Sequence, residues 1–208
     1  MSFEDKSIHD FIDELAAASA TPGGGTAAAL AGAMGAALIG MVCKLTVNKK
    51  EFAAVREELR GVIEEAEVWC RQLTDLADAD SRAFDQVMAA YRLPKATPEE
   101  QLSRQRAIQD ALRHAAQVPL DTAIACAAVV NLAHQVISTI NPSAMSDVGA
   151  AVLLAEAGLR AAQLNVMINL SSIKDSDFVQ EKREVLEDAL SGAEGQKERI
   201  FNYVLERI

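Results

Sequence analysis

The chain has 208 residues, half of them hydrophobic, and its 20 basic and 30 acidic residues give a formal net charge of −10 at pH 7. A chain of this length typically forms one domain whose core needs no disulfide or metal to support it. An acidic protein without a long run of Lys or Arg lacks the charge that binds a phosphate backbone, so the composition argues against nucleic-acid binding.

Residue usage favours helix throughout the chain. Only 4% of residues are aromatic, Ala is abundant, and long stretches lack the alternation of β-branched residues that strands need. No low-complexity linker divides the chain, so we expect residues 1–208 to form one all-α domain of about six helices. The acidic N-terminal stretch has no basic segment followed by an apolar one, so we expect no export signal and a cytoplasmic protein. Cys43, Cys70 and Cys126 lack metal-ligand or disulfide spacing.

Proline and glycine mark the expected helix boundaries. The first three helices are expected at roughly residues 4–18, 26–47 and 50–92, and the third ends ahead of Pro94. Thr97, followed by Pro98 and two glutamates, indicates the start of a fourth helix, which Pro119 should kink or restart. A fifth helix opens at residues 141–143 and runs to about 170, and Asp175 starts a sixth that runs towards the C-terminus.

The second expected helix is rich in Ala and Gly. Ala28, Gly32, Ala36 and Gly40 recur every four residues and form a ridge with little side-chain bulk, along which a neighbouring helix can approach closely. Such ridges also pair membrane helices. The uncharged run 27–43 is shorter than the ~20 strongly apolar residues of a span, and charged helices flank it, so we expect a buried central helix and no membrane association.

Asp80 interrupts an apolar face of the third expected helix. The three-four spacing places it in line with Leu73, Leu76, Phe84 and Val87. A carboxylate on a core-facing stripe needs hydrogen bonds, a cation or a cleft, and partial desolvation raises its pKa towards the range useful for proton transfer. Two interpretations stay open: a catalytic acid–base, or a structural carboxylate bonded to a neighbouring helix end.

The fifth expected helix has a similar ridge, which carries Asp147, Asn165 and Asn169. Amides can pair with the donors and acceptors of a heterocycle, but they can equally tie helices together. Asp147 lies in the first turn, where a carboxylate also stabilises the helix N-terminus.

The glycines at 23–25 lack the Lys-Ser/Thr of a phosphate-binding loop. They can present backbone amides to a ligand at the start of the second helix, or they can form a tight turn. Cations that would suit an anionic ligand gather near helix ends, at Lys44, Lys49, Lys50, Arg92 and Lys95.

Several segments, in order along nearly the whole chain, resemble the cyclodeaminase/cyclohydrolase family. They are TPGGGTAAALAGAMGAALIGMVCKLT, DADSRAFDQVMAAYRLPK, AIQDAL, VPLDTA and SDVGAAVLLAEAGLRAAQLNVMINL. The family comprises the cyclodeaminase half of formiminotransferase-cyclodeaminase and stand-alone methenyltetrahydrofolate cyclohydrolases. MVCKLT, AFDQVMAAYRLPK and AGLRAAQLNV resemble the stand-alone branch of serine-cycle type.

The resemblance implies an all-helical homodimer with a folate-binding cleft, and it places the family's acid–base aspartate at Asp80. It further implies that the loop 23–25, Asp147 and Asn165 line or shape the cleft. The pterin would then take Asn165 and Asp147 as partners, and the glutamate tail would take cations such as Lys49 and Lys50, with Lys44 nearby.

The implied reaction adds water to the amidinium carbon of 5,10-methenyltetrahydrofolate and opens the ring to 10-formyltetrahydrofolate. That carbon is already electrophilic, so we expect no metal and no cofactor, and Asp80 would move the protons and balance the charge of the cation. Two alternatives stay open. One is formimidoyltetrahydrofolate cyclodeaminase, which closes the same ring with loss of ammonia, and the other is a non-catalytic helical assembly protein.

Overall fold

The computed structural model describes residues 3–208, and this part of the chain contains six α-helices, three short 3-10 helices and no strand. The elements are η1 (Phe3–Asp5), α1 (Ile8–Ala16), α2 (Gly24–Val47), η2 (Lys50–Val55), α3 (Arg56–Tyr91), α4 (Pro98–Val136), η3 (Pro142–Ala144), α5 (Met145–Leu170) and α6 (Ser176–Leu205). The all-α class and the six helices expected from the sequence are confirmed.

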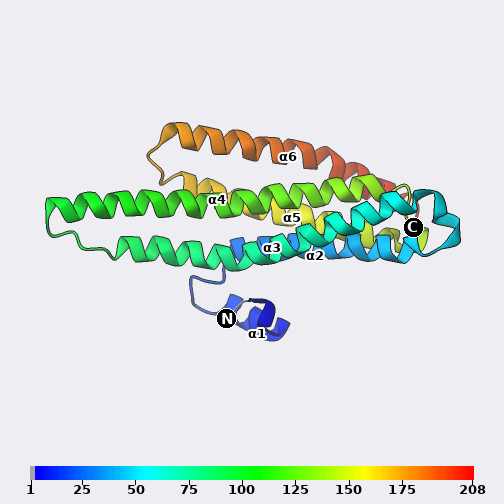
Figure 1. Cartoon of the computed structure of the whole chain (residues 1–208), viewed down its shortest axis with the longest axis horizontal. Helices are drawn as coiled ribbons and strands as arrows, with labels where there is room; N and C mark the ends of the chain where they lie inside the picture. The colour runs from blue at the N-terminus through cyan, green and yellow to red at the C-terminus, as the bar shows by residue number, and fades with distance from the viewer. Residues whose placement is uncertain (1–2) are drawn as a thin grey trace.

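Helix α2 packs against α3, α4 and α5 and lies partly behind α3 in Figure 1. Helix α6 covers α4 and α5, whereas α1 lies outside the bundle at the N-terminal end. Helices α3 and α4 extend beyond the other helices at one end, where the loop between them turns (Figure 1). The start of α2 and the end of α5 lie together, since a Cβ on Gly24 would meet Asn165, and both lie beside α3 and α4.

The helix starts follow the local capping chemistry. Thr97 accepts a hydrogen bond from the Glu100 N–H (3.2 Å) and Glu100 accepts one from the Thr97 N–H (3.2 Å), which completes a capping box.

The third helix differs from its expected bounds at the N-terminal side. Residues 50–55 form a 3-10 helix with a non-helical Phe52, so α3 has 36 residues and is about 54 Å long at 1.5 Å per residue.

Pro119 does not end or restart α4, contrary to the expectation of a possible restart. The 39-residue helix runs through it from Pro98 to Val136. Proline has no N–H, so the Ala115 carbonyl lacks its usual partner four residues on. The Asn169 side chain of α5 donates a hydrogen bond to this carbonyl (2.7 Å) and so replaces the missing partner.

The small-residue ridge of α2 is buried, as expected, and it brings three helices into close contact. A Cβ on Gly158 of α5 would lie 2.7 Å from the Ala28 carbonyl oxygen and 2.9 Å from the Cys126 sulfur, and one on Gly32 would lie 2.5 Å from the same sulfur. Burial raises the pKa of the Cys126 thiol to about 12, so this sulfur is a neutral packing group. Helices α2, α4 and α5 therefore meet where only glycine fits.

Gly158→Ala is expected to lower the free energy of unfolding by about 1–3 kcal/mol, because the added methyl overpacks a contact that includes backbone. Gly192→Ala in α6 is the matched control, since a Cβ there meets nothing within 4 Å. The control is expected to gain up to about 1 kcal/mol from helix propensity. Denaturant unfolding measures both changes, and a neutral Gly158→Ala variant would contradict the packing described.

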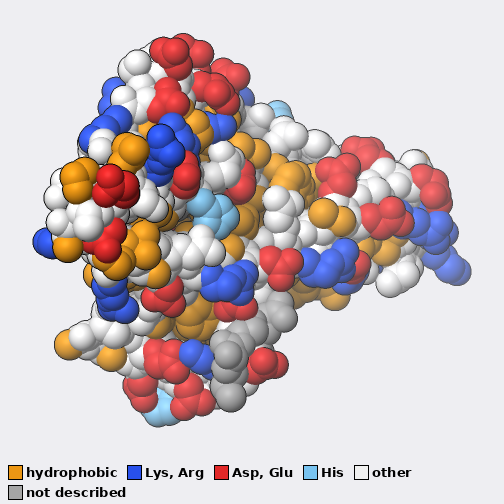
Figure 2. Space-filling model, turned by 60° about the vertical axis from the view of Figure 1, so that its left-hand side comes forward, with side chains coloured by type: hydrophobic (Ala, Val, Ile, Leu, Met, Phe, Trp, Pro, Cys, Tyr) orange, Lys and Arg blue, Asp and Glu red, His pale blue; other side chains and the backbone are white. Residues whose placement is uncertain are grey.

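The uncharged run 27–43 is shorter than a membrane span, but the whole of α2, with 24 residues, is long enough to cross a membrane. In the part of the chain that the structure describes, three helical stretches are long and apolar enough to cross a membrane, namely α2, α4 and residues 142–170. The most apolar stretches of α2 and α4 are 61% and 67% buried within the chain, but that of residues 142–170 is only 39% buried. Hydrophobic side chains accordingly lie exposed among charged ones on the molecular surface (Figure 2).

Candidate active site

A cavity of about 330 Å³ lies where the start of α2 meets α3, α4 and the end of α5. Its lining residues are Ala20, Thr21, Gly23, Gly24, Gly25, Asp80, Ala83, Phe84, Val87, Ala115, Asn165, Ile168 and Asn169. The structure thus brings together the glycine loop, Asp80 and Asn165. Their roles in binding or catalysis stay predictions.

Asp80 reaches from α3 to the N-terminus of α2. Its Oδ2 accepts a hydrogen bond from the Thr26 hydroxyl (3.0 Å), and the Thr26 backbone N–H bonds the same carboxylate. The N-cap residue of α2, Gly23, supplies no side-chain cap. Asp80 therefore occupies the position that a capping side chain would fill, so the structural interpretation of this residue and the catalytic one are both compatible with its place in the cavity.

Burial raises the pKa of the Asp80 carboxyl above its ordinary value, and the two hydrogen bonds from Thr26 oppose this effect only in part. Desolvation disfavours the charged form of an acid, whereas donors that point at the carboxylate favour it. The pKa of Asp80 is therefore raised overall, which makes its carboxylate more basic. A residue that accepts a proton from water needs this property.

Gly25 makes room for the Asp80 carboxylate. A Cβ at this position would lie 2.2 Å from Oδ1 and 2.6 Å from Cγ of Asp80. The neighbouring Gly24 has no such constraint, because a Cβ there would meet only the Asn165 side-chain nitrogen at 3.7 Å. The second and third residues of the triple glycine thus differ: the position of Asp80 requires glycine at Gly25, whereas there is room for a Cβ at Gly24.

Two asparagines of α5 face the cavity one helical turn apart. The Asn165 amide nitrogen donates to the Ala161 carbonyl of its own helix (2.9 Å), and that of Asn169 donates to Ala115 of α4 (2.7 Å). These bonds fix both amide planes and engage the nitrogens. The oxygens of the two amides remain as acceptors for a ligand.

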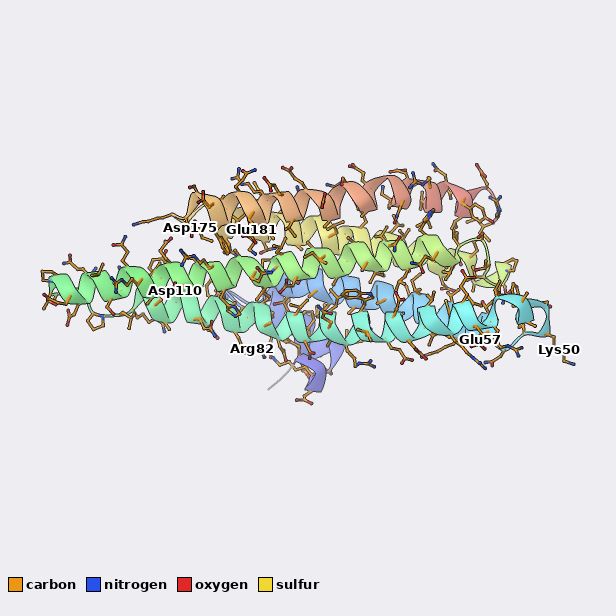
Figure 3. All side chains as sticks on the ribbon, turned by 45° about the horizontal axis from the view of Figure 1, so that its top comes forward. Lys50, Glu57, Arg82, Asp110, Asp175 and Glu181 are labelled. Carbon is orange, nitrogen blue, oxygen red and sulfur yellow. The ribbon has the colours of Figure 1, made fainter. Side chains whose placement is uncertain are left out.

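The structure does not bring the other four predicted residues to this cavity. Lys44 lies about 28 Å from Gly25 along α2, and Asp147 about 27 Å from Asn165 along α5, at 1.5 Å per residue. Lys44 pairs instead with Glu67 (2.7 Å). Lys49 and Lys50 follow the end of α2, and Figure 3 shows Lys50 at the opposite end of the bundle from Arg82 and Asp110. The prediction that these four residues share one cleft with Asp80 in a protomer is not supported.

Sequence reasoning missed several residues of the cavity. Thr26 is fully buried and bonds Asp80, yet a threonine in an Ala/Gly helix carries no signal of this kind. Phe84 and Val87 were identifiable, since they share the stripe of Asp80.

Among the described residues, no three His, Cys, Asp or Glu side chains come together as a metal site.

The chain shares its sequence and its fold with known proteins over nearly its whole length. The profile of the formiminotransferase-cyclodeaminase family matches residues 7–188. The chain belongs to this family. It is 45% identical over 203 residues to the methenyltetrahydrofolate cyclohydrolase of Methylorubrum extorquens, and the match covers 98% of each chain. It is 37% identical to the formimidoyltransferase-cyclodeaminase of Rattus norvegicus over 94% of its own length, but spans only 36% of that protein.

The family fold is also seen in a crystal structure, that of formiminotetrahydrofolate cyclodeaminase from Thermotoga maritima. It superposes on this chain with a TM-score of 0.88 at 32% sequence identity, over 98% of each chain. The family therefore includes, at comparable lengths, one protein named for hydrolysis of a cyclic amidine and one named for its formation with loss of ammonia.

Proposed function

We propose that this chain is a methenyltetrahydrofolate cyclohydrolase, which adds water to 5,10-methenyltetrahydrofolate and yields 10-formyltetrahydrofolate. The observation that carries the proposal is a partly buried carboxylate of raised pKa, Asp80, in a cavity lined by Gly23, Gly24 and Gly25 and by two fixed asparagines. The near full-length relationship to a protein of that name supports this choice of substrate.

The chemistry requires one base in a partly dry site. Asp80 accepts a proton from water as the water oxygen bonds to the amidinium carbon, and the neutral carbinolamine forms. The carbon–N5 bond then breaks, N5 receives a proton from the Asp80 carboxyl, and the carbinol proton leaves as the formyl carbonyl forms. One proton is released per turnover. Before addition, the Asp80 carboxylate also balances the positive charge of the substrate.

The runner-up activity is ring closure of formimidoyltetrahydrofolate with release of ammonia, which the names of other family members suggest. Both reactions need an acid–base group beside the same carbon. Measuring methenyl hydrolysis and ammonia release with the same preparation separates them. We expect methenyl hydrolysis to be faster, and faster ammonia release would reverse the assignment. Absence of both activities would favour the assembly protein instead.

The active form is proposed to be a homodimer that buries an apolar face of α2 and α5. Exposed hydrophobic side chains follow three-four spacing on both helices: Met34, Met41 and Leu45 on α2, and Leu153, Leu164, Met167 and Ile168 on α5. Neighbouring antiparallel helices with matching apolar stripes form a surface suited to a second copy. Ile168 also lines the cavity, so this face reaches the candidate active site.

Leu164→Glu is expected to convert the dimer into monomers, because Leu164 is 71% exposed in the protomer and a charge there would be desolvated in the interface. Leu102→Glu on the projecting part of α4 is the matched control, with 51% exposure on another face. Light scattering after size exclusion measures the mass of each. A monomeric parent chain, or a dimer that survives Leu164→Glu, would contradict the proposed interface, and recovery of the parent chain with membranes would assign the face to lipid.

The proposal includes no metal and no cofactor, because the amidinium carbon of the substrate is electrophilic without a Lewis acid. It also places the enzyme in the cytoplasm and without a nucleic-acid partner, which the net charge of −10 disfavours. Activity that is unchanged after treatment with a strong chelator is the expected result.

A further inference from the structure

The candidate active site continues into a second cavity of about 400 Å³. Three segments line both cavities at successive turns. Helix α3 contributes Val87 to the first and Tyr91 to the second, α4 contributes Ala115 and then Leu112, and the end of α5 contributes Asn169 and then, just beyond the helix, Ser172. The two cavities therefore follow one another along a single groove.

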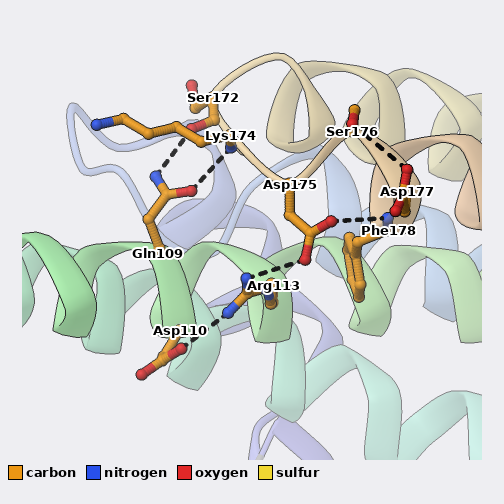
Figure 4. A network of polar contacts seen from close by, with 9 residues as sticks. All are labelled: Gln109, Asp110, Arg113, Ser172, Lys174, Asp175, Ser176, Asp177 and Phe178. Carbon is orange, nitrogen blue, oxygen red and sulfur yellow. Dashed lines mark hydrogen bonds and ion pairs between the residues drawn. The ribbon is translucent and has the colours of Figure 1, made fainter.

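The second cavity is basic on an acidic protein. Its charged lining residues are Arg104 and Lys174, and none of the described lining residues is acidic. Among the described residues, neither cation has a carboxylate partner within ion-pair distance. Arg113, nine residues after Arg104 on α4, differs in this respect. Its guanidinium pairs with the carboxylates of both Asp110 and Asp175 (Figure 4).

Neutral groups hold the Arg104 guanidinium and the backbone at Lys174 in place. Arg104 donates to the Tyr91 carbonyl from Nε (3.3 Å) and Nη2 (3.0 Å), which leaves three of its five N–H donors for a ligand. Gln109 accepts from the Lys174 N–H (2.8 Å) and donates to the Ser172 carbonyl (3.2 Å), which fixes the loop against α4 (Figure 4). Little backbone ordering is then required when an anion binds.

We propose that this second cavity binds the glutamate carboxylates of the folate substrate through Arg104 and Lys174. The inference rests on the proposed function, since the p-aminobenzoylglutamate arm is attached to N10, beside the reacting carbon at Asp80. Asp80 and Tyr91 are about 16 Å apart along α3 at 1.5 Å per residue, so the arm can follow the groove. The distant Lys49 and Lys50, to which the sequence assigned this role, are not needed.

The test compares a stable folate, 5-formyltetrahydrofolate, with the corresponding pteroate, which lacks the glutamate. Calorimetric binding of both is measured for the parent chain, Arg104→Gln, Lys174→Gln and the double variant. Arg106→Gln is the matched control, because Arg106 is an exposed cation of the same helix outside the cavity lining. Lys174→Gln leaves the bonds of Arg104 to α3 intact, so its effect does not depend on the stability of that helix end.

We expect the parent chain and Arg106→Gln to bind the folate more tightly than the pteroate. Each single variant should weaken folate binding by roughly threefold and the double by roughly tenfold, with pteroate binding unchanged, as is typical of partly exposed ion pairs. Added salt should reduce the preference of the parent chain. A preference that survives in the double variant, or equal binding of both ligands by the parent chain, would overturn the inference.

Failure of the proposed function is distinguishable from failure of this inference. One outcome is that neither methenyl hydrolysis nor ammonia release is found, while the preference for the glutamate-bearing ligand exists and disappears in the double variant. This outcome supports the anionic subsite and overturns the proposed reaction. If hydrolysis is found but the parent chain binds folate and pteroate equally, only the anionic subsite is overturned. If no folate binds, both are overturned.

Discussion

Asp80→Asn is expected to lower kcat for methenyl hydrolysis by about 100-fold or more, the usual contribution of a positioned general base. The amide neither accepts the proton from water nor balances the cationic substrate. Its shape is retained, and the Thr26 hydroxyl can rotate to suit either end of the amide. The decay of methenyl absorbance gives kcat, and circular dichroism checks that the variant is folded.

The same variant decides between the catalytic and the capping interpretations of Asp80. Burial raises the pKa of this carboxyl in the folded state above its unfolded value of about 3.8, so the folded chain binds the extra proton more tightly. Its ionised form therefore opposes folding, and stability falls as pH rises through the interval between the two pKa values. Asp80→Asn should be more stable than the parent chain at neutral pH, and the difference should shrink below that interval.

Thermal unfolding at several pH values measures this linkage. A variant that is less stable than the parent chain at neutral pH, but retains activity, would identify Asp80 as a helix cap and not as the catalytic base. In the active parent chain, kcat should fall as pH decreases through the raised pKa, because protonated Asp80 cannot accept a proton from water.

Gly25→Ala is expected to reduce kcat/KM by about 100-fold, the scale on which a displacement of about 1 Å affects catalysis. Its methyl group would lie 2.2 Å from Asp80 Oδ1, so the carboxylate must move away from Thr26 and from its place in the cavity. We also expect a loss of about 1–3 kcal/mol in the free energy of unfolding from overpacking. Steady-state kinetics and denaturant unfolding measure the two effects.

Gly24→Ala is the matched control for that prediction, since it makes the same chemical change one residue earlier. Its Cβ would be in ordinary contact, 3.7 Å from the Asn165 nitrogen, so activity should change by no more than a few fold. Equal effects of the two substitutions would show that the loop needs glycine for its conformation alone and that Asp80 does not depend on Gly25.

Helix positions were predictable because their signals are local. Three local signals each determine a boundary within a few residues: the Thr97 cap with its Glu100 partner, the proline that follows α3, and the glycines at the start of α2. The burial of α2 was predictable as well, since an Ala/Gly ridge allows close helix contacts. The uninterrupted run of α4 through Pro119 was not predictable, because the group that compensates for the proline, Asn169, is 50 residues away in sequence and reaches Ala115 only in the folded bundle.

The candidate site was predictable only in part, because a shared helix face does not imply a shared site. Asp147 and Asn165 lie on one ridge of α5, but the helix is long enough to place them at opposite ends of the bundle. The sequence singled out Asp80 as a carboxylate that interrupts an apolar stripe, and the structure places it in a cavity with the glycine loop, while its role stays a prediction. The basic groove at Arg104 and Lys174 depends on three separate segments, so no single stretch of sequence indicates it.

The most direct test of the central claim is the absorbance of 5,10-methenyltetrahydrofolate after addition of the parent chain or of Asp80→Asn at equal concentration. We predict a decay far faster than in buffer with the parent chain, and a decay close to that of buffer with the variant. Equal decay with both proteins would contradict the role of Asp80, and decay no faster than buffer with the parent chain would contradict the proposed reaction itself.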